Sequence, residues 1–106
     1  MEQREYVRRL LETYRETPGT TGAARRPDRL FAVQLHERGV PVETVENALM
    51  LAAARRLARP ADAPPLGVIR SLAYFSPVID EVLQLKVGQE YFQHLRYKLQ
   101  RISAVR

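Results

Sequence analysis

The strongest constraint on the fold is an apolar periodicity from Val68 to Leu85, which reads VIRSLAYFSPVIDEVLQL. At 100° per residue its large apolar side chains fall on one arc about 140° wide. The arc comprises Val68, Ile69, Leu72, Phe75, Ile79, Val82 and Leu83. Its phase continues through Pro77, whereas a loop at that point would lose it. The spacing therefore predicts one core helix over about 68–85, kinked where Pro77 removes a backbone donor.

A second interpretation of the same stretch places a helix boundary in its middle. Ser76 would cap a separate helix, and Pro77 would be the first residue of that helix, where proline is favoured. Both interpretations bury Phe75 and Ile79.

The rest of the chain predicts further helices and no strands. Periodic apolar residues at helical spacing indicate helices over about 3–16, 27–38, 41–58 and 89–102. Loops rich in glycine or proline are expected at about 17–26 and 59–66. The 41–58 segment is apolar nearly all round, which is typical of a central helix. The sequence thus predicts an all-α fold, a compact bundle of about five helices in a single domain over 1–106.

Length and composition narrow the function classes. A chain of 106 residues forms one domain that buries roughly two thirds of its unfolded surface. The chain has no cysteine, which excludes disulfides and thiolate metal sites and makes an intracellular setting the default. No apolar run approaches the length of a membrane span, and the start, MEQREYVRRL, lacks a signal-peptide core. We expect a cytoplasmic protein that does not contact a membrane.

Catalytic and metal-binding signatures are missing from the sequence. The two histidines, His36 and His94, are far apart and show no HExxH spacing, so surface roles are favoured over metal ligation. Asp80 and Glu81 are adjacent, which places them about 100° apart on a helix and poorly for paired acid–base work. The glycines are isolated turn residues and form no phosphate loop. We expect no enzymatic activity, no cofactor, no metal and no small-molecule substrate.

The segment LHERGVPVETVENAL, residues 35–49, has the outline of a helix-turn-helix. A recognition helix there would offer Glu43, Glu46 and Asn47 to the major groove. Two carboxylates would repel phosphates, and only Asn47 resembles a base reader. An ordinary helix corner is the favoured interpretation, with both glutamates simply favourable near the positive end of the helix dipole.

Charge placement indicates a nucleic-acid contact at the C-terminal end of the chain. The net charge is +5, and no acid follows Glu90. His94, Lys98 and Arg101 are spaced i, i+4, i+7 along one edge of the last apolar stripe, with Tyr97 beside them. A basic strip with an aromatic neighbour suits phosphate contact with some stacking. The alternative is that these cations only complement the helix dipole.

Four more arginines extend the predicted nucleic-acid site. Arg96 belongs to the same last helix, and Arg25, Arg26 and Arg29 add a second cluster if the fold brings them near it. Arginine is suited to bidentate phosphate binding, although an arginine-rich composition also arises from codon usage.

The order of features from Val42 to Leu83 resembles a known family. VETVENALMLAAARR, a proline-broken linker and then IRSLAYFSPVIDEVL are similar to the C-terminal helical domain of DnaD-type primosome and phage replication proteins. The signature of that domain is a tyrosine, an isoleucine four residues on and a tryptophan four after that. Tyr74 and Val78 stand at the first two positions, and Val82 stands where the family has tryptophan. The resemblance implies binding of single- or double-stranded DNA, self-association and contact with replication-initiation proteins.

Together these features predict a small, non-enzymatic accessory protein of DNA metabolism, connected with replication or a mobile element. Its partners would be DNA, and a second copy of itself or a replication protein. The alternative is a protein–protein adaptor or homodimer without a nucleic-acid role, whose last helix docks on a partner through its apolar stripe.

Overall fold

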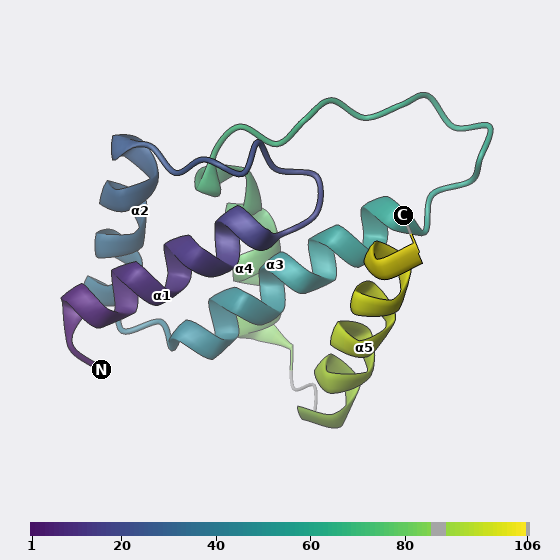
Figure 1. Ribbon diagram of the computed structural model, residues 1–106. Helices are drawn as coiled ribbons and strands as arrows, with labels where there is room; N and C mark the ends of the chain where they lie inside the picture. Colours follow the sequence, from purple (N-terminus) through teal and green to yellow (C-terminus); the bar gives the residue numbers. More distant parts are fainter. Residues whose placement is uncertain (86–88, 106) are drawn as a thin grey trace.

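The computed structural model describes residues 1–85 and 89–105 of the chain, and the regular elements within them are helices joined by loops (Figure 1). The elements are α1 (Gln3–Glu16), α2 (Arg26–Glu37), α3 (Val42–Leu57), the 3-10 helix η1 (Leu72–Phe75), α4 (Ser76–Gln84) and α5 (Gln89–Val105). The predicted all-α bundle of about five helices is confirmed. None of the described helices combines the length and the apolar character that crossing a membrane requires.

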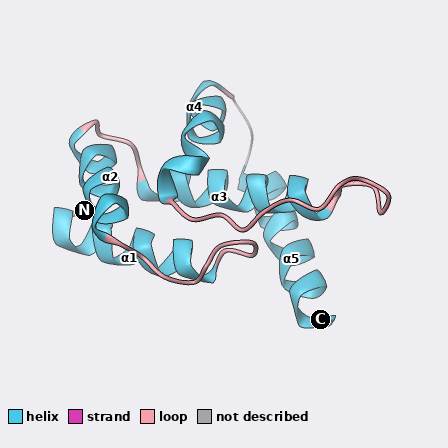
Figure 2. Cartoon of the chain, turned by 90° about the horizontal axis from the view of Figure 1, so that it is seen from above, coloured by secondary structure: helices cyan, strands magenta, loops and turns pink. Residues whose placement is uncertain are grey.

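The central helix is α3, as its all-round apolar sequence predicted. It contacts α1, α4, α5 and η1, and Figure 2 shows it between α1 and α4. Val45, Ala48 and Leu49 on α3 are fully buried. The small side chains of Ala52 and Ala53, also buried, let neighbouring helices approach this end of α3 closely. The core of the protein is therefore arranged around one helix.

The predicted helix over 68–85 begins later than the sequence indicated. The backbone around Ile69 is not helical but forms an isolated parallel bridge with Thr20. The Ile69 N–H donates to the Gly19 carbonyl at 2.7 Å, and the Thr21 N–H donates to the Ile69 carbonyl at 3.1 Å. These bonds to the first loop replace the bonds of a helical turn. Ile69 is nevertheless buried, so its side chain matches the apolar spacing of a helix although its backbone is not helical.

At Pro77 the structure lies between the two interpretations of the sequence. Residues 72–75 form a 3-10 turn that continues directly into α4 at Ser76, without a loop. Pro77 lies in the first turn of α4, where its missing N–H has no intrahelical partner to lose. Phe75 and Ile79 are both buried, as predicted. Leu83, at the end of the predicted arc, is 44% exposed.

A buried carboxylate joins the beginning of α2 to the beginning of η1. Asp28 is 2% exposed, and its Oδ2 accepts a hydrogen bond from the Arg25 N–H at 2.8 Å. Its Oδ1 accepts one from the Leu72 N–H, also at 2.8 Å. From its place in the first turn of α2, this carboxylate is expected only to interact favourably with the helix dipole. The structure adds a tertiary link across 44 residues of chain.

Replacing Asp28 with asparagine is predicted to destabilise the protein strongly. Each carboxylate oxygen accepts one backbone N–H, whereas asparagine has one oxygen and an NH₂ group that cannot accept. One buried N–H therefore loses its partner, and we expect the free energy of unfolding to fall by about 2–3 kcal/mol. Chemical denaturation followed by circular dichroism measures it.

The matched control is Asp80→Asn on the exposed side of α4, where the carboxylate lies 3.8 Å from Arg38. That substitution is expected to change stability by no more than about 0.5 kcal/mol. Equal losses in the free energy of unfolding would show that the hydrogen bonds of Asp28 stabilise the protein no more than an exposed ion pair does.

Candidate nucleic-acid interface

The predicted phosphate-binding residues form two groups that the fold keeps apart. One group lies on α5 and the other at the start of α2, and these helices lie at opposite ends of the molecule in both views (Figures 1 and 2). The second cluster is therefore not brought near the first. Each group has to be considered as a separate surface.

The group on α2 is larger than the sequence indicated. Arg25, Arg26 and Arg29 line a surface hollow of about 360 Å³ together with Arg8 and Arg15 of α1. Leu11 and Ala24 complete the lining, so no carboxylate takes part. We call this feature the arginine hollow. Five arginine residues therefore line a single depression between two helices.

The charges of the arginine hollow are mostly uncompensated. Arg8 lies 3.6 Å from Glu12 in an exposed pair one helical turn apart. Among residues 1–85 and 92–102, no ion pair or side-chain hydrogen bond engages the guanidinium groups of Arg15, Arg25, Arg26 or Arg29. The hollow is thus a concentrated positive surface.

Arg8 and Arg15 were not among the residues predicted to bind nucleic acid, because α1 alternates acidic and basic residues, a pattern typical of a solvated helix face whose charges pair along it. The available signal was their separation of seven residues, which places both side chains on one line along α1. The buried carboxylate of Asp28 then fixes the start of α2. With α2 packed against α1, its three arginines reach the same depression.

The group on α5 forms a separate exposed edge. Phe92 and Leu99 are buried and attach α5 to the core, which leaves His94, Lys98 and Arg101 on the solvent side. Tyr97 is 57% exposed, and the Arg101 guanidinium lies 5.8 Å from its ring centroid. The predicted basic edge with an aromatic neighbour is therefore present.

Arg96 does not belong to that edge. It lines a different hollow, on the side where α5 faces Arg9 and Glu46. At 100° per residue it lies roughly opposite the edge that carries His94. The sequence placed all these cations in one group, and the helix separates Arg96 from the others.

Two residues of the helix-turn-helix outline are unavailable to a DNA groove. Asn47 is 8% exposed, and the Glu46 side chain is only 11% exposed. The Glu46 carboxylate accepts hydrogen bonds from Arg9 Nη2 at 2.7 Å and from Thr13 Oγ1 at 2.6 Å. The favoured helix corner is thus supported, but Glu46 does more than complement a dipole. It links α3 to α1.

Glu46→Gln is predicted to destabilise the protein more than Glu43→Gln does. Arg9 Nη2 and Thr13 bond to different carboxylate oxygens, and glutamine has an NH₂ group in place of one of them and no charge. We therefore expect a loss of about 1–3 kcal/mol in the free energy of unfolding. Glu43 is exposed and lies 3.6 Å from Arg9, so its replacement should cost at most about 1 kcal/mol. Urea denaturation of both variants provides the comparison. Equal losses would mean that the link between α1 and α3 is no stronger than a surface ion pair.

The adjacent carboxylates of α4 serve two different arginines. Arg55 donates two hydrogen bonds to Glu81, one of them at 2.8 Å. These bonds lower the pKa of Glu81 below its usual value. The Glu81 side chain is 38% exposed, and its bonds to Arg55 connect α4 to α3 at the surface. Asp80 lies near Arg38, so the two acids do not form a pair.

The histidines do not converge. His36 Nε2 lies 2.9 Å from the Met1 carbonyl oxygen, and its ring contacts Tyr6 edge-on at 5.1 Å. His94 lies on α5, at the other end of the molecule. No three histidine, cysteine, aspartate or glutamate side chains in the described part of the chain are placed to hold a metal ion.

Comparison of the chain with protein-family models, with curated proteins and with solved structures gives no match. The charged surfaces described above are therefore the basis on which a function can be proposed.

Proposed function

We propose that this protein is a non-enzymatic accessory protein of DNA metabolism that binds the phosphate backbone of nucleic acid. The arginine hollow would be the main contact, and the exposed edge of α5 a second one. The observation that supports this most directly is that five arginines, from α1, the loop before α2 and α2 itself, line one depression that no carboxylate lines.

Phosphate is the ligand that best fits such a surface. A guanidinium group binds phosphate through two parallel hydrogen bonds, and its charge does not titrate at physiological pH. Each phosphate that is neutralised also releases condensed counterions, which favours binding at low salt. Arg26 is the first residue of α2, so the positive end of that helix adds to the same field.

The edge of α5 offers a different kind of contact. Lys98 and Arg101 are exposed cations, and the exposed ring of Tyr97 provides a surface on which a base can stack. This combination favours single-stranded nucleic acid. The resemblance to DnaD-type domains points in the same direction, and it adds self-association and a replication-initiation partner to the proposal.

The adaptor alternative has less support from the fold. It requires the apolar stripe of α5 to be free for a partner. Phe92 and Leu99 of that stripe are 5% and 8% exposed, because they already pack within this chain. Ile102, at 43% exposed, offers only a small apolar surface.

Three double variants, each removing two positive charges, test the proposal. They are Arg26→Gln/Arg29→Gln in the arginine hollow, Lys98→Gln/Arg101→Gln on α5 and the control Arg38→Gln/Arg70→Gln outside both surfaces. Fluorescence anisotropy with short single- and double-stranded oligonucleotides at several salt concentrations gives the affinity and its salt dependence. We expect the hollow variant to lower the salt slope by about 1.8, or about 0.9 per lost phosphate contact.

The control should keep the slope of the unmodified protein, because its two arginines make no phosphate contact in the proposal. A hollow variant that behaves like the control would exclude the arginine hollow as the binding surface. If the unmodified protein shows no salt-sensitive binding to either kind of oligonucleotide, the nucleic-acid proposal is wrong and the adaptor alternative replaces it.

A further inference from the structure

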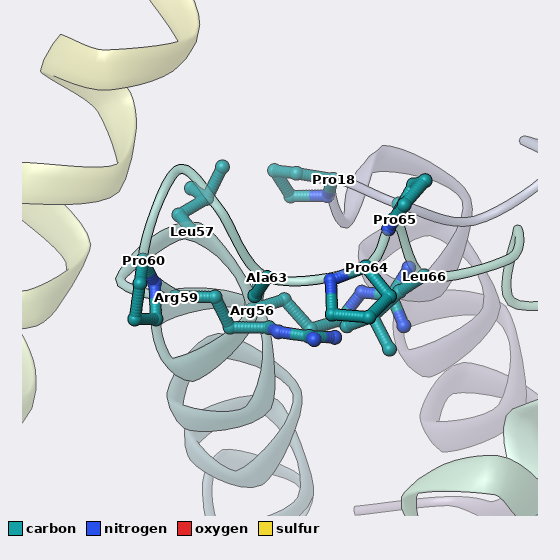
Figure 3. A pocket seen from close by; sticks show the side chains of 11 residues that line it. Pro18, Arg56, Leu57, Arg59, Pro60, Ala63, Pro64, Pro65 and Leu66 are labelled. Carbon is teal, nitrogen blue, oxygen red and sulfur yellow. The ribbon is translucent and has the colours of Figure 1, made fainter.

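A second arginine-containing hollow lies beneath the loop that joins α3 to η1 (Figure 3). It measures about 350 Å³, and four prolines, including Pro64 and Pro65, form much of its wall with Leu57 and Leu66. Its charged lining residues are Arg56 and Arg59, and no carboxylate lines it. We call it the proline hollow. It shares no residue with the arginine hollow.

Arg56 is held in place on several sides. Its Nη2 donates to the Gly67 carbonyl at 2.7 Å, and its Nη1 donates to the Tyr74 hydroxyl at 3.2 Å. The guanidinium also lies 5.8 Å from the Tyr74 ring centroid. On the other side is Gly19, where φ is 94° and a Cβ would stand 3.2 Å from Arg56 Nε. The orientation of this cation is therefore set before any ligand binds, which lowers the entropic cost of binding.

Arg59 is partly buried and lacks a counterion. No side-chain hydrogen bond or ion pair joins its guanidinium to any residue in 1–85 or 92–102. In Figure 3 its side chain extends under the loop toward Pro64. It also lines the neighbouring hollow that contains Tyr74, as Arg56 does. Taking a cation partly out of water is unfavourable unless an anion compensates it, and the described part of the chain provides no such anion at this place.

We infer that the proline hollow binds a nucleoside phosphate. The phosphate monoester would lie on the guanidinium groups of Arg56 and Arg59, which bind such oxygens in pairs. The sugar and base would lie against the apolar wall that includes Pro64, Pro65 and Leu66. A concave site of a few hundred Å³ that combines apolar wall residues with a few convergent charges is typical for ligands of this size. A free nucleotide and the 5′-phosphorylated end of a strand present the same chemistry.

Nuclear magnetic resonance of the full-length, ¹⁵N-labelled protein tests this inference. The ligands are adenosine monophosphate, adenosine, inorganic phosphate, and a short oligonucleotide with or without a 5′-phosphate. The nucleotide or the 5′-phosphorylated strand should cause saturable shifts in residues 56–67. Adenosine, phosphate and the unphosphorylated strand should bind this site at least about tenfold more weakly. Which of the two phosphorylated ligands binds more tightly identifies the source of the group.

Arg59→Gln is the informative variant, because the Arg59 side chain makes no bond on which folding depends. It should weaken binding at least about tenfold, whereas Arg70→Gln, an equal loss of charge outside the hollow, should change it less than about twofold. Arg26→Gln/Arg29→Gln should leave nucleotide binding unchanged, which separates this site from the proposed nucleic-acid surface. The inference is overturned if no phosphorylated ligand gives saturable shifts at millimolar concentration. It is also overturned if adenosine monophosphate shifts residues of the arginine hollow and not residues 56–67, or if Arg59→Gln and Arg70→Gln weaken its binding equally.

Discussion

The interaction on which the rest of the structure depends is the pair of hydrogen bonds accepted by Asp28. One carboxylate oxygen fixes where α2 begins, and the other fixes where η1 begins. The chain between these points contains α2, α3 and the proline-rich loop, so the two bonds close a long loop. A buried carboxylate is unfavourable unless both oxygens find donors, and both find them here. The position of α2 against α1, and with it the arginine hollow, follows from this closure.

The same fold divides the arginines into two classes. Arg9 and Arg55 bond to Glu46 and Glu81, and these pairs join α3 to α1 and to α4. Their charges are used within the protein. No carboxylate among the described residues pairs with Arg59 in the proline hollow. The same holds for the arginines of the arginine hollow, with the exception of Arg8. Much of the uncompensated part of the net charge of +5 therefore lies in these two hollows. They are surfaces at which an external anion would bind.

Several features were predictable from the sequence because they depend on local periodicity. The all-round apolar pattern of α3 predicted its central place, and periodicity predicted a helix ending near residue 38, next to Gly39, where φ reaches 75°. The start of the 68–85 helix was not predictable in this way. Ile69 is buried through a backbone bridge to a loop 49 residues earlier, and periodicity cannot distinguish that burial from burial in a helix.

The candidate sites show the same division. Exposure of the basic edge of α5 follows from its amphipathic pattern and was predicted. The arginine hollow combines helices separated by a loop, and the proline hollow combines Gly19, Arg56 and Gly67, so neither could be recognised from local spacing. The tertiary hydrogen bonds of Asp28 and Glu46 could not be recognised from the sequence for the same reason. A carboxylate near the start of a helix is already explained by its interaction with the helix dipole.

Amide hydrogen exchange at Leu72 tests the central claim most directly. If Asp28 holds the beginning of η1 to α2, the Leu72 N–H should exchange only through global unfolding, with an opening free energy equal to that of the whole protein. The nearby Val68 N–H, for which the structure shows no hydrogen bond, should exchange rapidly and serve as the internal reference. Exchange of Leu72 at the rate of Val68 would contradict the account, because it would show that the Asp28 link opens without unfolding the protein.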